Sequence, residues 1–281
     1  MENNFKNINK NFSTLAKNHY ENFPVASLLI PKYYRKEIAI IYWFARTADD
    51  IADEGNLESE KRLDKLNKFE EEFKNALNGI SKNLNFVLLA KTINEKKLFT
   101  EHFLSLLSAF RQDVGKKRYE SFEEVLDYCK RSANPVGRIL LELFKVSDKE
   151  AIISSDKICT ALQLTNFLQD TVIDFEKGRI YYPQEELRIF SVTEKIFELK
   201  ENNPNIKALV KLNVDRTQVL FDEGKSLLQY LSGRFKYEIK WTIACGEKIL
   251  SKIRKNDYDV FTKRPKLSKI DFITLLIKNI F

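Results

Sequence analysis

Apolar residues recur every three or four positions along most of the chain, which is the spacing of an amphipathic α-helix. Turn signals interrupt the pattern: Pro24 and Pro31 bracket an early turn, and Gly55 and Asn56 stop the first long stretch. The pattern predicts helices over residues 33–54, 58–78, 84–93, 98–113, 121–145, 149–176, 205–231, 234–255 and 266–280.

Composition supports the same fold class. The 281 residues contain only 8 Gly and 6 Pro, while Lys, Glu, Leu and Ile are abundant throughout. We therefore expect an all-α protein, and because no linker interrupts the sequence we expect a single domain over residues 1–281. Within 121–145, Pro135 and Gly137 predict either a kinked helix that lines a pocket or a break between two short helices.

Net charge and cysteine content limit the classes of partner and the cellular location that we expect. The formal net charge is +7, but Lys is mixed with Glu along the predicted helices, so we expect a solvated surface and no nucleic-acid partner. Cys129, Cys159 and Cys245 form no CxxC pair, which indicates reduced, buried thiols in a cytoplasmic protein. The polar N-terminus lacks the apolar core of a signal peptide, and no apolar run reaches the roughly 20 residues of a membrane span.

The first candidate for chemistry is the acidic cluster ADDIADE at 48–54. At about 100° per residue, Tyr42, Arg46, Asp49 and Asp53 fall within a sector of roughly 60° on a helix. The neighbouring sequence is strongly apolar, so these polar groups interrupt a stretch that should be buried. Either a metal ion or an internal ion pair is needed to satisfy them.

The second cluster is QDTVID at 169–174. Gln163, Asn166, Asp170 and Asp174 share a sector of about 80° on an ideal helix, among apolar neighbours. Taken alone, either cluster would be interpreted as surface carboxylates or as ion-pair partners. Together they indicate a metal-dependent diphosphate enzyme, because carboxylate oxygens suit a divalent metal that binds a diphosphate.

Several segments resemble the squalene and phytoene synthase family of head-to-head prenyl-diphosphate enzymes. They are HYENFPVASLLIP at 19–31, YWFARTADDIADE at 42–54, RYESFEEVLDYCKRSANPVG at 118–137 and QLTNFLQDTVIDFEKGRIYYP at 163–183. The HYENFPV opening, the QD pair and NDYDVFTKRPKLS at 256–268 are most similar to the bacterial hydroxysqualene synthase branch of hopanoid biosynthesis.

The resemblance implies a helical bundle around a central cavity, with Mg²⁺, or Mn²⁺ in its place, bound by side-chain oxygens. The implied metal ligands are Asp49, Asp53, Asn166, Asp170 and Asp174. It also implies that a prenyl diphosphate is bound by His19, Phe23, Arg46, Gln163, Asn166, Lys177, Arg179 and Tyr181. Tyr42, Phe23 and Tyr128 are candidates to face the carbocation, although any single aromatic is more often a packing residue.

The resulting expectation is a Mg²⁺-dependent enzyme that converts presqualene diphosphate and water to hydroxysqualene and diphosphate. One alternative is the condensation of two prenyl diphosphates to presqualene diphosphate, squalene or phytoene. Another is a non-catalytic paralogue that resembles respiratory-complex assembly factors. Both intact acidic clusters argue against this alternative.

Residues 270–281 predict either a helix that packs on its own bundle or a peripheral contact with the inner face of the membrane. Enzymes of squalene and hopanoid synthesis are the expected partners.

Overall fold

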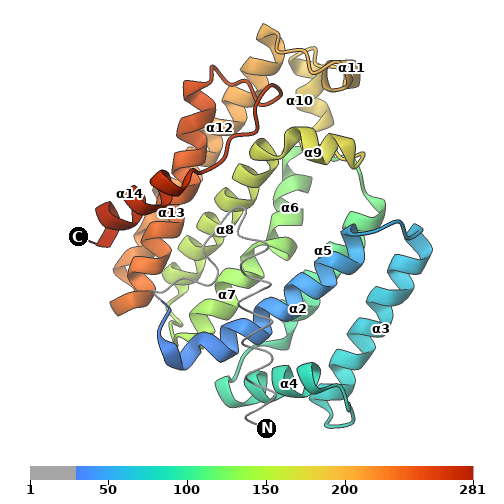
Figure 1. Ribbon diagram of the computed structural model, residues 1–281, viewed down its shortest axis with the longest axis vertical. Coiled ribbons are helices and arrows are strands. Elements are labelled where there is room, and N and C mark those ends of the chain that lie inside the picture. The colour runs from blue at the N-terminus through green and yellow to red at the C-terminus, as the bar shows by residue number, and fades with distance from the viewer. Residues whose placement is uncertain (1–29, 281) are drawn as a thin grey trace. The chain divides into compact units, whose positions relative to one another are not determined.

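The computed structural model describes residues 30–280 of the chain. His19 and Phe23 therefore lie outside the described residues. From residue 30 to residue 280 the chain folds into α-helices and short 3-10 helices without a strand (Figure 1). The predicted all-α fold class is confirmed.

The helices follow one another with short connections. In chain order they are η1 Lys32–Tyr34, α2 Arg35–Asp53, α3 Ser59–Leu77, α4 Leu84–Lys96, α5 Thr100–Gly115, α6 Phe122–Ser132, α7 Asn134–Leu143, α8 Lys149–Gln169, α9 Thr171–Glu176, α10 Gln184–Ile189, α11 Glu194–Glu198, α12 Pro204–Gly224, η2 Lys225–Gln229, α13 Gly233–Lys255 and α14 Lys269–Ile280. Several begin at capping residues: the side chains of Asp148 and Asn203 accept hydrogen bonds from backbone N–H groups in the first turns of α8 and α12.

Residue contacts divide the chain into two compact units, which are described separately. Unit 1 comprises residues 1–115 and 138–147, and unit 2 comprises residues 116–137 and 148–281. The expectation of a single domain over residues 1–281 stays a prediction.

Unit 1 is built around phenylalanine side chains from α2, α3 and α5. Phe44 is fully buried, and its ring centroid lies 4.9 Å from that of Phe73 and 5.4 Å from that of Phe103. Along α2 the buried residues recur at helical spacing, through Phe44, Ala48 and Ala52. The acidic cluster follows a line about 100° around the helix axis from this buried stripe, so core packing fixes the direction in which its carboxylates point.

In unit 2, α8 packs against α12 and α13. The close approach of α12 and α13 depends on Gly246, because a Cβ atom there would lie 2.5 Å from the Phe221 ring and 3.0 Å from Leu162. Phe221 is itself fully buried. Two neighbouring helices, α12 and α13, therefore hold α8 in place, and α8 leads into the second acidic cluster.

Three of the predicted helices are interrupted. The helix predicted over 205–231 ends as α12 at Gly224 and continues as the 3-10 helix η2. Residues 121–145 form α6 and α7 with a break at Ala133, so the second of the two alternatives is the observed one. The prediction of one helix over 149–176 was wrong, because α8 ends at Gln169 and α9 begins at Thr171. The hydroxyl of Thr171 donates to the backbone carbonyls of Phe167 or Leu168, at 3.0 and 3.2 Å, which competes with the regular helical bonds at this point. The short helices α10 and α11 had not been predicted.

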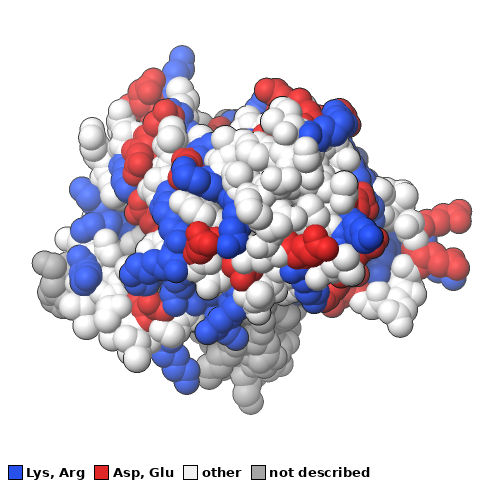
Figure 2. Space-filling model, turned by 90° about the horizontal axis from the view of Figure 1, so that it is seen from above, with Lys and Arg blue, Asp and Glu red and all other residues white. Residues whose placement is uncertain are grey.

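The surface and the cysteines agree with the expectations from composition. Figure 2 shows acidic and basic side chains interspersed on one face of the molecule. Cys129 and Cys245 are buried free thiols, as predicted, while Cys159 is half-buried. Across residues 30–280, no helix combines the length and the apolar character needed to cross a bilayer.

Candidate active site

The first acidic cluster forms a compact ion-pair group on α2 in unit 1. Nη1 of Arg46 lies 2.9 Å from Oδ2 of Asp49, and Nη2 lies 2.7 Å from Oδ1 of Asp50. Asp53 is half-buried one turn after Asp49. Carboxylate oxygens on one side of a helix are ligands that suit a hard divalent cation.

Tyr42 stands one turn before Arg46 on the same side of α2. Burial raises the pKa of its hydroxyl, Arg46 lowers it, and the carboxylates of Asp50 and Asp49 raise it again, with a net upward shift. The Tyr42 hydroxyl therefore stays protonated at neutral pH. The side chain can donate a hydrogen bond or present its ring, but it does not act as an anion.

The second acidic cluster lies at the junction of α8 and α9 in unit 2. Gln163 and Asn166 are half-buried on α8, Asp170 is the residue at the break, and Asp174 lies in the first turn of α9. The amide of Asp174 donates to the carbonyl of Asp170 at 2.8 Å, so helical spacing continues through the junction. The two aspartates stay one turn apart although the helix is interrupted.

Arg264 is a site residue that sequence reasoning missed. Its Nε lies 2.5 Å from Oδ1 of Asp170, and both side chains are mostly buried. The segment 256–268 had been singled out only for its resemblance to the hydroxysqualene synthase branch. The position of Arg264 within that segment was the only sequence feature that could have indicated a role at the site, because Arg264 and Asp170 are 94 residues apart in the chain. Each acidic cluster thus has an arginine on a carboxylate.

Tyr128 and Tyr181, two of the predicted site residues, belong to one aromatic cluster in unit 2. The ring of Tyr181 is stacked on Phe167, with a centroid distance of 3.7 Å and an interplanar angle of 8°. Tyr128 lies 6.0 Å from Phe167 and 5.9 Å from Tyr181, and Tyr119 lies 5.5 Å from Tyr181. Phe167 is on α8, three residues before Asp170, so the aromatic cluster adjoins the second acidic cluster along the chain.

A small pocket is lined both by the second acidic cluster and by the segment that follows α9. Its lining includes Asp174, Arg179, Tyr181 and Tyr182. Arg179 is almost completely buried, and the hydroxyls of Tyr182 and Thr171 are 3.0 Å apart. Arg179 and Tyr181 therefore lie beside Asp174, whereas Lys177 is exposed at the end of α9.

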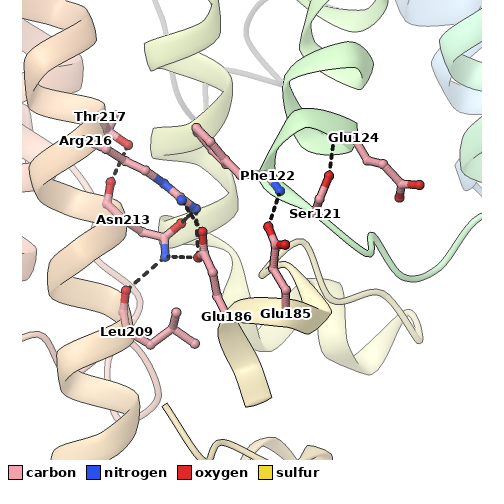
Figure 3. A network of polar contacts seen from close by, with 9 residues as sticks. All are labelled: Ser121, Phe122, Glu124, Glu185, Glu186, Leu209, Asn213, Arg216 and Thr217. Atoms are coloured by element: carbon pink, nitrogen blue, oxygen red, sulfur yellow. Dashed lines mark hydrogen bonds and ion pairs between the residues drawn. The ribbon is translucent and has the colours of Figure 1, made fainter. Parts of the chain in front are cut away.

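The segment after α9 is anchored to α12 by a buried polar network (Figure 3). Glu186 of α10 forms a paired contact with the guanidinium group of Arg216, and Asn213 binds both side chains. The guanidinium carbon of Arg216 lies 3.5 Å from the centroid of the Phe122 ring. A buried charge pair of this kind is costly to break, because removal of one partner leaves the other charge without compensation.

Arg118 anchors the same segment at its other end. Its guanidinium group donates to the backbone carbonyl of Gly178 at 2.6 Å and binds the Glu194 carboxylate at 2.7 and 2.9 Å. The backbone amides of Ile180 and Gln184 donate to the carbonyls of Lys117 and Tyr119, at 3.0 and 2.8 Å. These contacts hold the chain that carries Arg179 and Tyr181.

The donors of these clusters suit a hard divalent cation. Among residues 30–280, no three His, Cys, Asp or Glu side chains converge closely enough to hold an ion by themselves. Oδ1 of Asn166, one turn before Asp170, is buried and has no hydrogen-bond partner within the described part of the chain. A buried amide oxygen in this state calls for a ligand, and oxygen-only donors match the preference of Mg²⁺. The residues present therefore fit the metal that the resemblance implies.

The structure groups the predicted residues as follows. Tyr42, Arg46, Asp49 and Asp53 lie together in unit 1; Tyr128, Gln163, Asn166, Asp170, Asp174, Lys177, Arg179 and Tyr181 lie in unit 2, with Lys177 turned to the surface. That the first pair of aspartates faces the second stays a prediction, as do the catalytic roles.

Comparisons with known proteins identify the family of the chain. Residues 16–271 match the squalene/phytoene synthase family. Hydroxysqualene synthases from Rhodopseudomonas palustris and Sinorhizobium fredii are 33% and 34% identical to the chain, over 90% and 86% of its length and 85% and 82% of theirs. The crystal structure of squalene synthase HpnC from Alicyclobacillus acidocaldarius superimposes with a TM-score of 0.84 at 36% identity, covering 92% of this chain and 97% of that one. The chain belongs to the squalene/phytoene synthase family.

Proposed function

We propose that this protein converts presqualene diphosphate and water to hydroxysqualene and diphosphate. The observation that carries the proposal is that both acidic clusters are complete, each with an arginine on a carboxylate, in a chain about one-third identical to two hydroxysqualene synthases over most of its length. A non-catalytic role has no comparable support.

The reaction is a substitution at carbon. The bond between carbon and the diphosphate oxygen breaks, and the diphosphate leaves with the bonding electrons. The carbocation rearranges, a water oxygen bonds to it, and one proton is released. The enzyme must therefore stabilise negative charge on the leaving group and protect positive charge on the hydrocarbon.

The proposed metal ligands are the oxygens of Asp49, Asp53, Asn166, Asp170 and Asp174. When bound there, Mg²⁺ or Mn²⁺ supplies Lewis-acid stabilisation to diphosphate oxygens. Arg46 and Arg264, already on the carboxylates, provide fixed positive charge for the leaving group. We also assign diphosphate contacts to His19, Gln163, Lys177 and Arg179.

The aromatic cluster is proposed to face the hydrocarbon. Ring faces carry negative potential, so Tyr128 and Tyr181, stacked with Phe167, stabilise a carbocation without reacting with it. Tyr42 and Phe23 are proposed for the same role. The rigid support of the Tyr181 segment by Arg118 and Arg216 would keep bulk water from this side.

Product analysis tests the assignment. Purified protein with Mg²⁺ is given presqualene diphosphate or farnesyl diphosphate in separate reactions, with and without NADPH, and the products are identified by mass spectrometry. The proposal expects hydroxysqualene from presqualene diphosphate alone, with one oxygen from ¹⁸O-labelled water. Squalene formed only with NADPH, or no turnover of presqualene diphosphate, would contradict it.

Condensation of farnesyl diphosphate is the second candidate. It is favoured by the squalene synthase that the fold matches at 36% identity. Consumption of farnesyl diphosphate in the same assay would assign the protein to that step. Association with other enzymes of squalene or hopanoid synthesis and a cytoplasmic location are proposed on the same basis.

A further inference from the structure

The last helix, α14, exposes a stripe of isoleucines to solvent. Ile270, Ile273 and Ile277 are 73%, 57% and 54% exposed. They fall within a sector of roughly 60° on the helix, so their side chains form one continuous apolar line. Single exposed apolar residues are common on protein surfaces, but three aligned on one helix indicate a contact surface.

The opposite side of α14 is already occupied. It packs on α13 in Figure 1, where the ring of Phe272 lies 6.2 Å from that of Trp241 in an edge-on contact. Oδ2 of Asp271 lies 2.7 Å from Nζ of Lys252, and Oδ1 lies 3.6 Å from Nζ of Lys248. The predicted packing of this helix on its own bundle is thus correct for one face. The isoleucine stripe belongs to the other face.

The charges on α14 divide between the same two faces. Asp271 is its only acidic residue, and its carboxylate is turned toward α13 and held by lysines. Lys269 and Lys278 are exposed and fall on opposite sides of the isoleucine sector. The outward face is therefore apolar along its centre and cationic on both edges. This is the pattern of a helix that lies in the interface of an anionic membrane.

We propose that the α14 face formed by Ile270, Ile273 and Ile277 binds the surface of an anionic lipid bilayer. The isoleucines enter the boundary between headgroups and acyl chains, while Lys269 and Lys278 remain at the level of the lipid phosphates. The inward position of Asp271 removes the one charge on the helix that the membrane would repel. The proposal does not depend on which diphosphate the enzyme uses, because it concerns binding alone.

Vesicle flotation of the full-length protein tests the proposal. The probes are vesicles of phosphatidylcholine alone and vesicles with about one-third phosphatidylglycerol, at low salt and at high salt. The wild type is expected to float with the anionic vesicles only, and less at high salt, because salt screens the lysines. Substitution of all three isoleucines by serine is expected to lower the bound-to-free ratio at least tenfold. Lys269→Gln and Lys278→Gln are each expected to lower it ~5-fold.

Matched controls separate the stripe from exposed isoleucine in general. Ile189→Ser removes an isoleucine that is 75% exposed on α10, and it should leave flotation unchanged, as should Lys65→Gln on α3. Circular dichroism should show unchanged helix content in the triple variant, because the replaced side chains are exposed. Failure of the wild type to float, or equal flotation of the triple variant, would overturn the proposal. So would a dimer, detected by light scattering, that the serine variant dissolves, because a second copy would then be the occupant.

Discussion

Single side chains at the two acidic clusters are held by ion pairs with arginine. Arg46 contacts Asp49 and Asp50, and Arg264 contacts Asp170. The sequence placed the aspartates on one side of each helix because helical spacing is a local property. It did not reveal Arg264, since a contact across 94 residues depends on how distant segments pack.

Replacing a carboxylate of either cluster should remove catalysis but preserve the fold. Asp53→Ala and Asp170→Ala are each expected to lower turnover of presqualene diphosphate by roughly 100-fold or more, because charge on the leaving group loses its stabilisation. Single-turnover kinetics measures the effect, with circular dichroism as the check on folding. Asp127→Asn is the control, since this exposed residue of α6 pairs only locally with Arg131. Normal turnover in both alanine variants would refute the metal assignment.

Thiol reactivity should differ among the cysteines. Burial raises the pKa of Cys129 and of Cys245 to about 12, whereas a free thiol titrates at about 8.5. At pH 8 the thiolate fraction of these two residues is therefore at least ~1000-fold lower than in the unfolded chain. Alkylation followed by peptide mass spectrometry should label Cys159 first, and all three at equal rates in denaturant. Rapid labelling of Cys129 in the native protein would contradict this burial.

At the level of elements, the break between α8 and α9 and the anchored segment after it shape the second cluster. At the break the Thr171 hydroxyl donates to the carbonyl of Phe167, and the segment is held by Arg118 and by Arg216. The apolar pattern did not distinguish α9 from a continuation of α8, because spacing is nearly unchanged through Asp170. The helices α10 and α11 are too short to show a periodic pattern of their own.

The contacts of Arg118 should control local opening of the segment that carries Tyr181. Arg118→Ala is expected to speed amide exchange at Ile180 and Gln184 by roughly tenfold, because their carbonyl partners lie on either side of Arg118. Exchange mass spectrometry measures this. Arg118→Lys should rescue only in part, since Lys cannot make the paired contact with Glu194. Lys68→Ala, at an exposed pair on α3, should change nothing. Unchanged amide exchange at Ile180 and Gln184 in Arg118→Ala would contradict a positioning role for Arg118.

Helix packing around α13 gives a test of stability. Gly246→Ala would place a Cβ atom 2.5 Å from the fully buried Phe221 ring, so we expect a loss of about 1–3 kcal/mol in the free energy of unfolding. Gly115→Ala meets no atom within 4 Å at the end of α5 and should be neutral or slightly stabilising. Urea denaturation measures both. Equal stability of the two variants would show that α12 and α13 can adjust.

For the whole molecule, the all-α class, most helix ranges and the family followed from the sequence. These rest on local periodicity and on motifs that are continuous in the chain. What did not follow are features set by distant contacts, such as Arg216 on Glu186 and the two faces of α14. Both require knowledge of which helix lies beside which.

Ligand binding should stabilise the whole protein most when both proposed ligands are present. Mg²⁺ with inorganic diphosphate at a hundred times its Kd is expected to raise Tm by roughly 5–10 °C, because binding to the native state alone shifts the folding equilibrium. Either ligand alone should give a smaller shift. Differential scanning fluorimetry of the wild type and of Asp170→Ala measures this. An equal combined shift in the variant would place the binding elsewhere.

The ion pair between Arg264 and Asp170 also has a consequence for the newly made chain. Asp170 emerges from the ribosome 94 residues before its partner, and α8 can begin to fold in that interval. Until Arg264 follows, the carboxylate at the helix junction lacks this counter-charge. The second cluster is therefore complete only after Arg264 has been made, and a chain that stops short of residue 264 would lack this ion pair.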